Sequence, residues 1–225
     1  MSTSSHYAER PVASADGYLM IPVGLALVGA GVWLLTRDAG SLGAVLVAVL
    51  LGVCGAFVLA GLYMLQPNTA AALTLFGAYR GSDRGEGLRW ANPLLSKRKV
   101  SLRARTLAVP TLKVNDKRGN PIEISAAVVW QVADTAQALF AVDDVDRFVG
   151  VQAESALRHL ASCYAYDEGE ADAGHGPTLR GSTDEVAHAL QAELEQRFER
   201  AGVRVQDAKL THLDRKSTRL NSSHS

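Results

Sequence analysis

The fold class is decided by residues 43–65, which read GAVLVAVLLGVCGAFVLAGLYML and carry no charged side chain. A second uncharged stretch, residues 18–36, reads YLMIPVGLALVGAGVWLLT. As helices these stretches would be about 34 and 28 Å long, enough to cross the apolar core of a bilayer. The short connection over residues 37–42 can join only antiparallel neighbours. The sequence therefore predicts a transmembrane helical hairpin.

Residues 1–17 precede the hairpin, and we expect them to form a disordered leader. A cleaved signal peptide is the alternative for the first apolar stretch. It is disfavoured because Arg10 is the only lysine or arginine of the leader and because a second span follows closely. The excess of lysine and arginine after the second span predicts a multi-pass protein of the cell membrane whose following domain faces the cytoplasm.

Small residues recur at every fourth position of the second span. They could let the backbone of another helix approach closely, and the first span is the nearest candidate partner. An alanine-rich composition could also produce this pattern by chance. The predicted packing stripe consists of Ala44, Ala48, Gly52, Ala56 and Ala60.

The region after the second span, residues 66–213, passes from strand patterns to helix patterns. Strands are expected over residues 72–76, 88–90 and 100–109. The clearest pattern is a hairpin over residues 112–132, in which polar turn residues separate two alternating apolar stretches. Strands followed by helices predict an α+β domain with an antiparallel sheet and packed helices.

Two helices are expected after this hairpin. Asp143 or Asp144 can cap the first, and Ser182 with Glu185 can form a capping box at the start of the second. A returning strand is expected over residues 203–213.

Charge is balanced over the whole chain but not locally. The 23 lysines and arginines equal the 23 aspartates and glutamates, so a uniformly basic nucleic-acid-binding protein is excluded and no nucleic-acid partner is expected. Basic residues dominate the segment after the second span, where they could contact anionic lipid head groups or form an ordinary solvated face. The candidate head-group contacts are Arg80, Arg84, Arg89, Lys97, Arg98 and Lys99.

No catalytic, cofactor-binding or metal site is predicted. The six histidines do not fall at metal-ligand spacing with a second histidine or a cysteine. Cys163 follows His159 by one helical turn, but the sequence names no orienting acid for this pair. An enzyme that uses Cys163 or the acidic loop is therefore ranked last. That loop contains Asp167, Glu168, Glu170, Asp172 and His175.

Several stretches of the region after the second span closely resemble, in order, the SPFH or band 7 domain of stomatins, prohibitins and flotillins. They are LTLFGAY (73–79), GLRWANP (87–93), LKVNDKRGNPIEI (112–124), VVWQV (128–132), QAESALR (152–158) and AGVRVQDAKLTHL (201–213).

The resemblance implies a non-catalytic, membrane-anchored scaffold that oligomerises and organises membrane microdomains, with lipids and further copies of itself as partners. An accessory regulator of a membrane-bound protease is the alternative. Relatives continue past the last strand into a long helix that drives assembly. Here residues 214–225 read DRKSTRLNSSHS and are expected to be a non-native or disordered tail, so the homo-oligomer is expected to be weakened.

Overall fold

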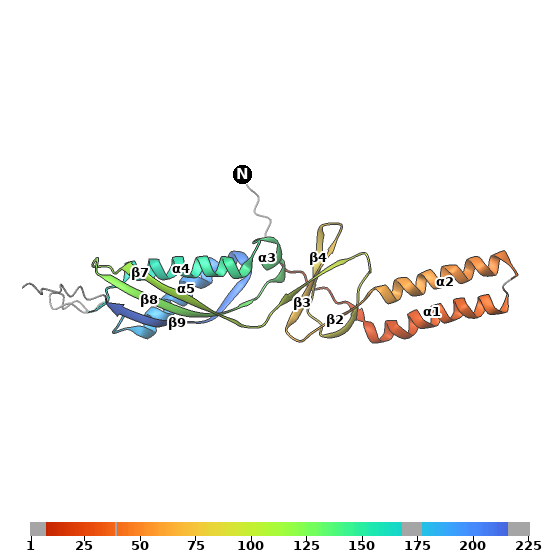
Figure 1. Ribbon diagram of the computed structural model, residues 1–225, viewed down its shortest axis with the longest axis horizontal. Coiled ribbons are helices and arrows are strands. Elements are labelled where there is room, and N and C mark those ends of the chain that lie inside the picture. The colour runs from red at the N-terminus through yellow and green to blue at the C-terminus, as the bar shows by residue number, and fades with distance from the viewer. Residues whose placement is uncertain (1–7, 39, 168–176, 216–225) are drawn as a thin grey trace, which may run out of the picture. The chain divides into compact units, whose positions relative to one another are not determined.

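The computed structural model of the chain describes residues 8–38, 40–167 and 177–215. The chain forms two compact units, residues 1–103 and 104–225 (Figure 1). The first unit contains two apolar helices and small antiparallel sheets, and the second contains a three-stranded antiparallel sheet with packed helices. The α+β class with an N-terminal helical hairpin is therefore confirmed.

The helical hairpin consists of α1 (Gly17–Arg37) and α2 (Leu42–Ala60), which lie side by side and antiparallel (Figure 1). The carboxylate of Asp16 caps α1 by accepting from the backbone N–H of Tyr18, and Ser41 caps α2 in the same way. At 1.5 Å per residue the helices are about 31 and 28 Å long, which matches the apolar thickness of a bilayer.

The second helix is shorter than predicted, because it ends at Ala60 rather than at Leu65. Residues Leu62–Leu65 form strand β2, which pairs antiparallel with β5 (Gly87–Trp90). Periodicity cannot separate a short apolar strand from the end of an apolar helix. The prediction therefore merged the two elements.

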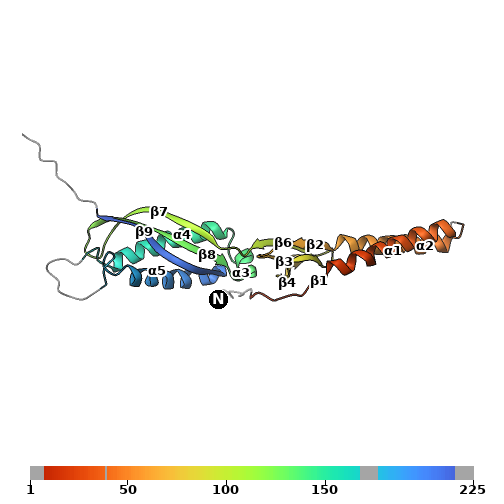
Figure 2. The same cartoon turned by 90° about the horizontal axis from the view of Figure 1, so that it is seen from below.

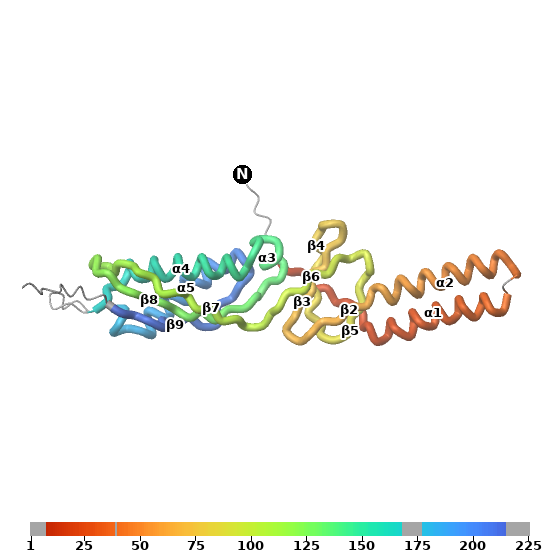
Figure 3. Tube along the Cα trace, in the orientation of Figure 1, coloured from red at the N-terminus to blue at the C-terminus, as the bar shows by residue number. Residues whose placement is uncertain are grey.

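The leader is more ordered than predicted over the residues that the structure describes. Strand β1 (Ala15–Asp16) pairs with β5, so β5 lies between β1 and β2. Further upstream, the backbone of Ser82 exchanges hydrogen bonds with Arg10 and Val12 at 2.8 and 3.0 Å. Figure 3 follows this extended segment into α1. The prediction of a disordered leader is therefore wrong for residues 8–16, which are extended and pair with strands of the first unit; we call this segment the strap. Residues 1–7 lie outside the described part.

A second small sheet completes the first unit, in the order β4-β3-β6. The central strand is buried along Ala70–Leu73. The predicted strand over residues 100–109 is divided at residues 102–104, where the Leu102 N–H turns back to the carbonyl oxygen of Asn68. The three strands are β3 (Thr69–Leu75), β4 (Ala78–Asp83) and β6 (Ser96–Ser101).

The second unit is built on a sheet of order β7-β8-β9. Its central strand alternates as predicted, with one face fully buried and the other partly exposed. Helix α4 contacts β7 and β8, α5 contacts β9, and Figure 2 shows both helices on the same side of the sheet. The strands are β7 (Arg105–Asn115), β8 (Pro121–Val132) and β9 (Val203–Arg215), and the helices are α3 (Thr135–Phe140), α4 (Val145–Cys163) and α5 (Thr183–Phe198).

The ends of these helices follow the predictions in part. Asp144 caps α4, as predicted, by accepting from the N–H of Arg147. A 3₁₀ turn (Glu199–Ala201) follows α5 and ends at Gly202, which takes the left-handed conformation. Ser182 precedes α5 but makes no side-chain cap, because its ψ of 50° departs from the extended backbone that a capping box requires. Strand β9 runs to Arg215, two residues beyond the predicted end.

Candidate membrane-proximal site

The end of α2 is held by side chains from the strands of the first unit. The last carbonyl groups of a helix lack partners within the helix and need other donors. The indole Nε1 of Trp90 donates to the carbonyl oxygen of Val58 at 2.7 Å, and Nζ of Lys97 donates to that of Gly61 at 3.2 Å. A cation at this position also complements the helix dipole. Helix α2 therefore passes directly into the sheet.

Lys97 is engaged inside the first unit rather than directed to solvent. Its ammonium lies 4.8 Å from the centre of the Tyr63 ring, a cation–π distance. Burial lowers the pKa of Lys97 from its ordinary value. Lys97 therefore stabilises the junction between α2 and the sheet.

A buried carboxylate, Asp83, organises the polar contacts behind this junction. Its side chain is 2% exposed and accepts from the hydroxyl groups of Ser14 and Tyr63 and from the backbone N–H of Gly85. The guanidinium Nε of Arg89 lies 3.5 Å from Oδ2 of Asp83. One carboxylate thus connects the leader, β2 and the loop after β4.

These contacts lower the pKa of the Asp83 carboxyl group and raise the pKa of the Tyr63 hydroxyl group. Burial alone would raise the pKa of Asp83, but the donors Ser14, Tyr63 and Gly85 and the charge of Arg89 lower it overall. Burial, and then the hydrogen bond to Asp83, raise the pKa of Tyr63 to about 12. Asp83 is therefore held ionised beside a neutral tyrosine.

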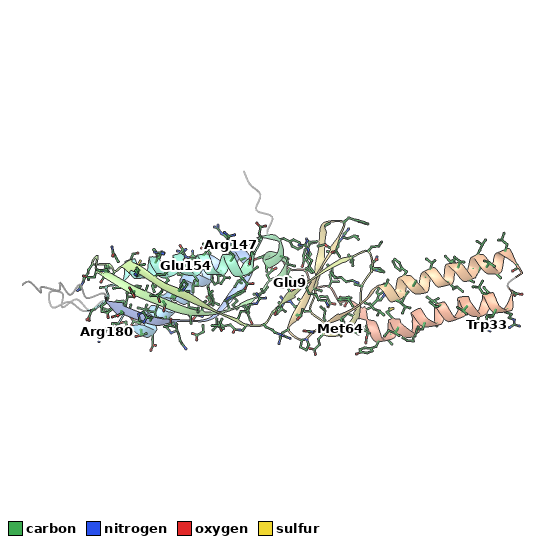
Figure 4. The ribbon with its side chains drawn as sticks, in the orientation of Figure 1. Glu9, Trp33, Met64, Arg147, Glu154 and Arg180 are labelled. Atoms are coloured by element: carbon green, nitrogen blue, oxygen red, sulfur yellow. The ribbon has the colours of Figure 1, made fainter. Side chains whose placement is uncertain are left out.

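Two of the predicted lipid-contact residues bind the leader. Arg89 donates from Nε to Oγ of Ser14 and from Nη2 to the Ser14 carbonyl oxygen, both at 2.7 Å. Arg84 forms a two-bond pair with the carboxylate of Glu9, at 2.6 and 2.7 Å. Figure 4 labels Glu9 on the extended segment before α1. These partners are about 75 positions away in the chain, so no local sequence pattern reveals them.

The other three predicted lipid contacts remain exposed. Arg80 lies on β4, and Arg98 and Lys99 lie on β6. Within residues 8–38, 40–167 and 177–215, none of the three forms an ion pair. The predicted set of six bases therefore divides in two. Arg84, Arg89 and Lys97 are engaged by other parts of the chain, although the Arg84 side chain is still 48% exposed. Arg80, Arg98 and Lys99 are exposed without an ion pair among the described residues, and we call them the exposed trio.

The helix face that packs within the hairpin differs from the predicted stripe in its second half. Ala48 and Gly55 are the buried residues of α2, and Ala44 and Gly52 are partly buried. Ala56 and Ala60 are exposed. A four-residue repeat drifts by about 40° per step on a helix of 3.6 residues per turn. The stripe therefore rotates away from α1, and Gly55 replaces Ala56 in the interface.

Close backbone approach at this interface depends on glycine. A Cβ atom at Gly55 would lie 2.6 Å from Cγ2 of Val28 and 2.9 Å from the carbonyl oxygen of Gly24. A Cβ at Gly31 would lie 2.9 Å from the carbonyl oxygen of Ala48. The two helices are thus in near backbone contact at two levels, as small residues permit in membranes.

The cysteine and histidine that the sequence suggested as a reactive pair lie in the second unit. Cys163 and His159 are neighbours on α4, with Sγ 3.8 Å from Nε2. Glu193 of α5, which the sequence interpretation did not connect to them, lies 2.9 Å from Nδ1 of His159. No local signal marks Glu193, because only the packing of α5 against α4 brings it there.

The predicted acidic loop falls mainly outside the described residues. Glu168, Glu170, Asp172 and His175 lie there, whereas Asp167 is described and is 3.8 Å from Nη1 of Arg180, which Figure 4 labels. Among the residues that the structure does describe, no cluster of three histidine, cysteine or carboxylate side chains could hold a metal ion.

The sequence model of the SPFH domain / Band 7 family matches residues 64–221, which is more than half of the chain. The match begins within β2, just after the helical hairpin. No curated protein matches the chain.

Proposed function

The chain belongs to the SPFH domain / Band 7 family, and from that premise we propose that it is a non-catalytic scaffold anchored in the cell membrane. Members of this family are generally membrane scaffolds without catalytic activity. The observation that carries the proposal is the junction at β5. This strand pairs with β1 before the hairpin and with β2 after it, so both ends of the hairpin meet one small sheet.

The hairpin has the features of a pair of membrane spans. Only 11% of the most apolar window of each helix is buried within the structure, so the remaining apolar surface needs lipid or another partner. At the closed end of the hairpin, Arg37 lies 5.1 Å from the centre of the Trp33 ring, and Figure 4 labels Trp33 there. Tryptophan and arginine are typical of the membrane–water boundary.

The first unit's sheets would then lie at the membrane surface, on the side that carries the leader. Trp90 and Lys97, which hold the end of α2, would lie at the boundary, where an aromatic ring with one polar group is favoured. The excess of basic residues after α2 supports a cytoplasmic location for this side.

The exposed trio supports a contact with anionic lipid. Basic side chains beside a span gain about 1 kcal/mol each from an anionic bilayer surface, and the strap does not occupy these three. We propose that Arg80, Arg98 and Lys99 select anionic head groups, whereas Arg84, Arg89 and Lys97 hold the fold together.

Lipid retention tests this division. The full chain, extracted in mild detergent from vesicles of equal phosphatidylglycerol and phosphatidylcholine, should retain phosphatidylglycerol in excess. The triple variant R80Q/R98Q/K99Q should lose about half of that excess or more, and higher salt should have the same effect. The matched control K117Q/R158Q/R204Q removes three exposed bases of the second unit and should leave the excess unchanged. Equal losses of phosphatidylglycerol in both variants would mean that the protein attracts anionic lipid by its general charge and not through the exposed trio.

Self-association is the second part of the proposal. In the described part of the chain, β7 and β9 each pair with β8 alone, so each leaves one edge available for another chain. The extracted protein should therefore run as a small oligomer in native electrophoresis, and should dissociate in part at the low end of a hundredfold range of concentration. A monomer at every concentration would contradict the scaffold proposal, and the protein would then be a membrane-anchored domain that does not self-associate.

A further inference from the structure

Cys163, His159 and Glu193 form a chain of contacts between α4 and α5. The thiol Sγ of Cys163 lies 3.8 Å from Nε2 of His159, and Nδ1 of His159 lies 2.9 Å from Oε1 of Glu193. A carboxylate only accepts hydrogen bonds, so Nδ1 carries the proton in this geometry and Nε2 presents its lone pair to the thiol. The order is that of a nucleophile, a base and an orienting carboxylate.

The three side chains differ in exposure in a way that suits a reactive thiol. Cys163 is exposed, and the His159 side chain is 59% exposed, so a small reagent can reach both. The Glu193 side chain is only 19% exposed. Nη2 of Arg197 lies 2.6 Å from the Glu193 carboxylate, and Nη1 donates to Ser155 at 3.0 Å. The carboxylate is therefore fixed from both helices.

The thiol stands at a helix end that is itself held in place. The residue after Cys163, Tyr164, accepts a hydrogen bond from the backbone N–H of Lys117 at 3.1 Å. Tyr166 donates its N–H to the buried carboxylate of Asp116 at 3.1 Å. These two bonds join the end of α4 to the turn between β7 and β8, so the helix end that carries the thiol is held by tertiary structure.

We propose that Cys163 is a base-activated thiol that undergoes exchange with a small disulfide, R–S–S–R. Its sulfur attacks one sulfur of the disulfide, a Cys163–S–S–R bond forms, and the original S–S bond breaks to release R–S⁻. His159 takes the thiol proton on Nε2 and passes it to water or to the leaving group, so the products are the mixed disulfide and either R–S⁻ with one released proton or, where the leaving thiolate is basic enough, R–SH. This is a stoichiometric modification of the protein, and it does not depend on the proposed scaffold function.

The rate of exchange in the full chain tests the proposal. Detergent-solubilised protein with Cys54→Ser would be treated near pH 7 with dithiobis-nitrobenzoate, and the released thiolate followed by absorbance. His159→Gln should lower the second-order rate constant about tenfold or more. Glu193 is a positioning residue, so Glu193→Gln should lower the rate constant less, by about threefold. Arg158→Gln, which removes an exposed charge next to His159, should leave the rate within about twofold.

Two further comparisons separate base activation from a structural effect. The double variant V151C/C163S moves the thiol to an exposed position of α4 more than two helical turns before His159, and should react as slowly as His159→Gln. It decides the matter even if His159→Gln does not fold. Near pH 10 every thiol ionises without help, so the rate ratios should fall towards one. The groups that face His159 from α5 are Glu193 and Arg197. Equal rates for all variants near pH 7, or ratios that persist near pH 10, would overturn the proposal.

Discussion

Asp83 connects three parts of the first unit through one buried carboxylate. Ser14 brings the leader, Tyr63 brings β2, and Gly85 brings the loop after β4. A buried charge costs stability unless it is hydrogen-bonded, and here each donor comes from a different segment. Removing the charge should therefore loosen the strap and the junction together.

We expect Asp83→Asn to lower the free energy of unfolding by about 2 kcal/mol, because it weakens several charge-assisted hydrogen bonds to a buried group. Thermal unfolding in detergent, followed by circular dichroism, measures the change. Asp146→Asn is the control, since the Arg105–Asp146 pair is exposed and its loss should cost less than about 0.5 kcal/mol. Similar losses in both variants would contradict a special role for Asp83.

The pH dependence of this difference has a fixed sign. The pKa of Asp83 is lowered in the folded state, so its contribution is fully present above the ordinary value of 3.8. It is lost as the pH falls below 3.8 through the lowered folded value. The gap between the wild-type protein and Asp83→Asn should therefore stay constant near neutral pH and close only in strong acid. A gap that closes between about pH 5 and pH 7 would assign the effect to another group.

At the scale of elements, the hairpin depends on where its glycines lie. Gly55 faces the backbone of α1, whereas a Cβ atom at Gly52 would meet no atom within 4 Å. The same substitution at these two positions should therefore have opposite effects.

Gly55→Ala should destabilise the hairpin by about 1–3 kcal/mol, because the added methyl group forces the helices apart. Gly52→Ala should be neutral or stabilise by up to about 1 kcal/mol, because alanine favours the helix. Melting temperatures in the same detergent compare the two variants. A loss at Gly52 as large as that at Gly55 would mean that the predicted stripe packs against a further helix.

The elements that could be predicted are those with a long, regular pattern. The two apolar helices follow from the length of their uncharged stretches, and the alternation of β8 follows from its period of two. The end of α2 at Ala60 could not be predicted, because Leu62–Leu65 is equally apolar and becomes a strand only by pairing with β5. The order of the leader likewise depends on pairing with strands about 70 positions later in the chain.

At the scale of the whole molecule, the sequence predicts which basic residues gather after α2, but not which of them bind within the chain and which stay exposed. The basic segment after α2 is visible in the sequence. Its division into Arg84, Arg89 and Lys97, which bind within the chain, and the exposed trio depends on distant partners such as Glu9 and Gly61. The same reason explains why Glu193 was not connected to His159: the contact exists only once α5 lies against α4.

We propose that the hairpin crosses the membrane twice, so that the leader and the chain after α2 lie on one side and the connecting turn lies on the other. Three single cysteines test it in a chain with Cys54 and Cys163 replaced by serine. Gly40→Cys places the thiol in the turn, where a side chain meets no neighbour. Ala8→Cys and Ala192→Cys place it at exposed positions of the leader and of α5.

A membrane-impermeant maleimide added to intact cells should label Gly40→Cys and leave Ala8→Cys and Ala192→Cys unreacted until the cells are opened. This pattern would show two crossings with the domain in the cytoplasm. Labelling of Ala8 and Ala192 with Gly40 protected would keep the crossings but reverse the orientation. Equal protection of all three positions in intact cells, with equal labelling after opening, would contradict the account, because the hairpin would then enter the membrane without crossing it.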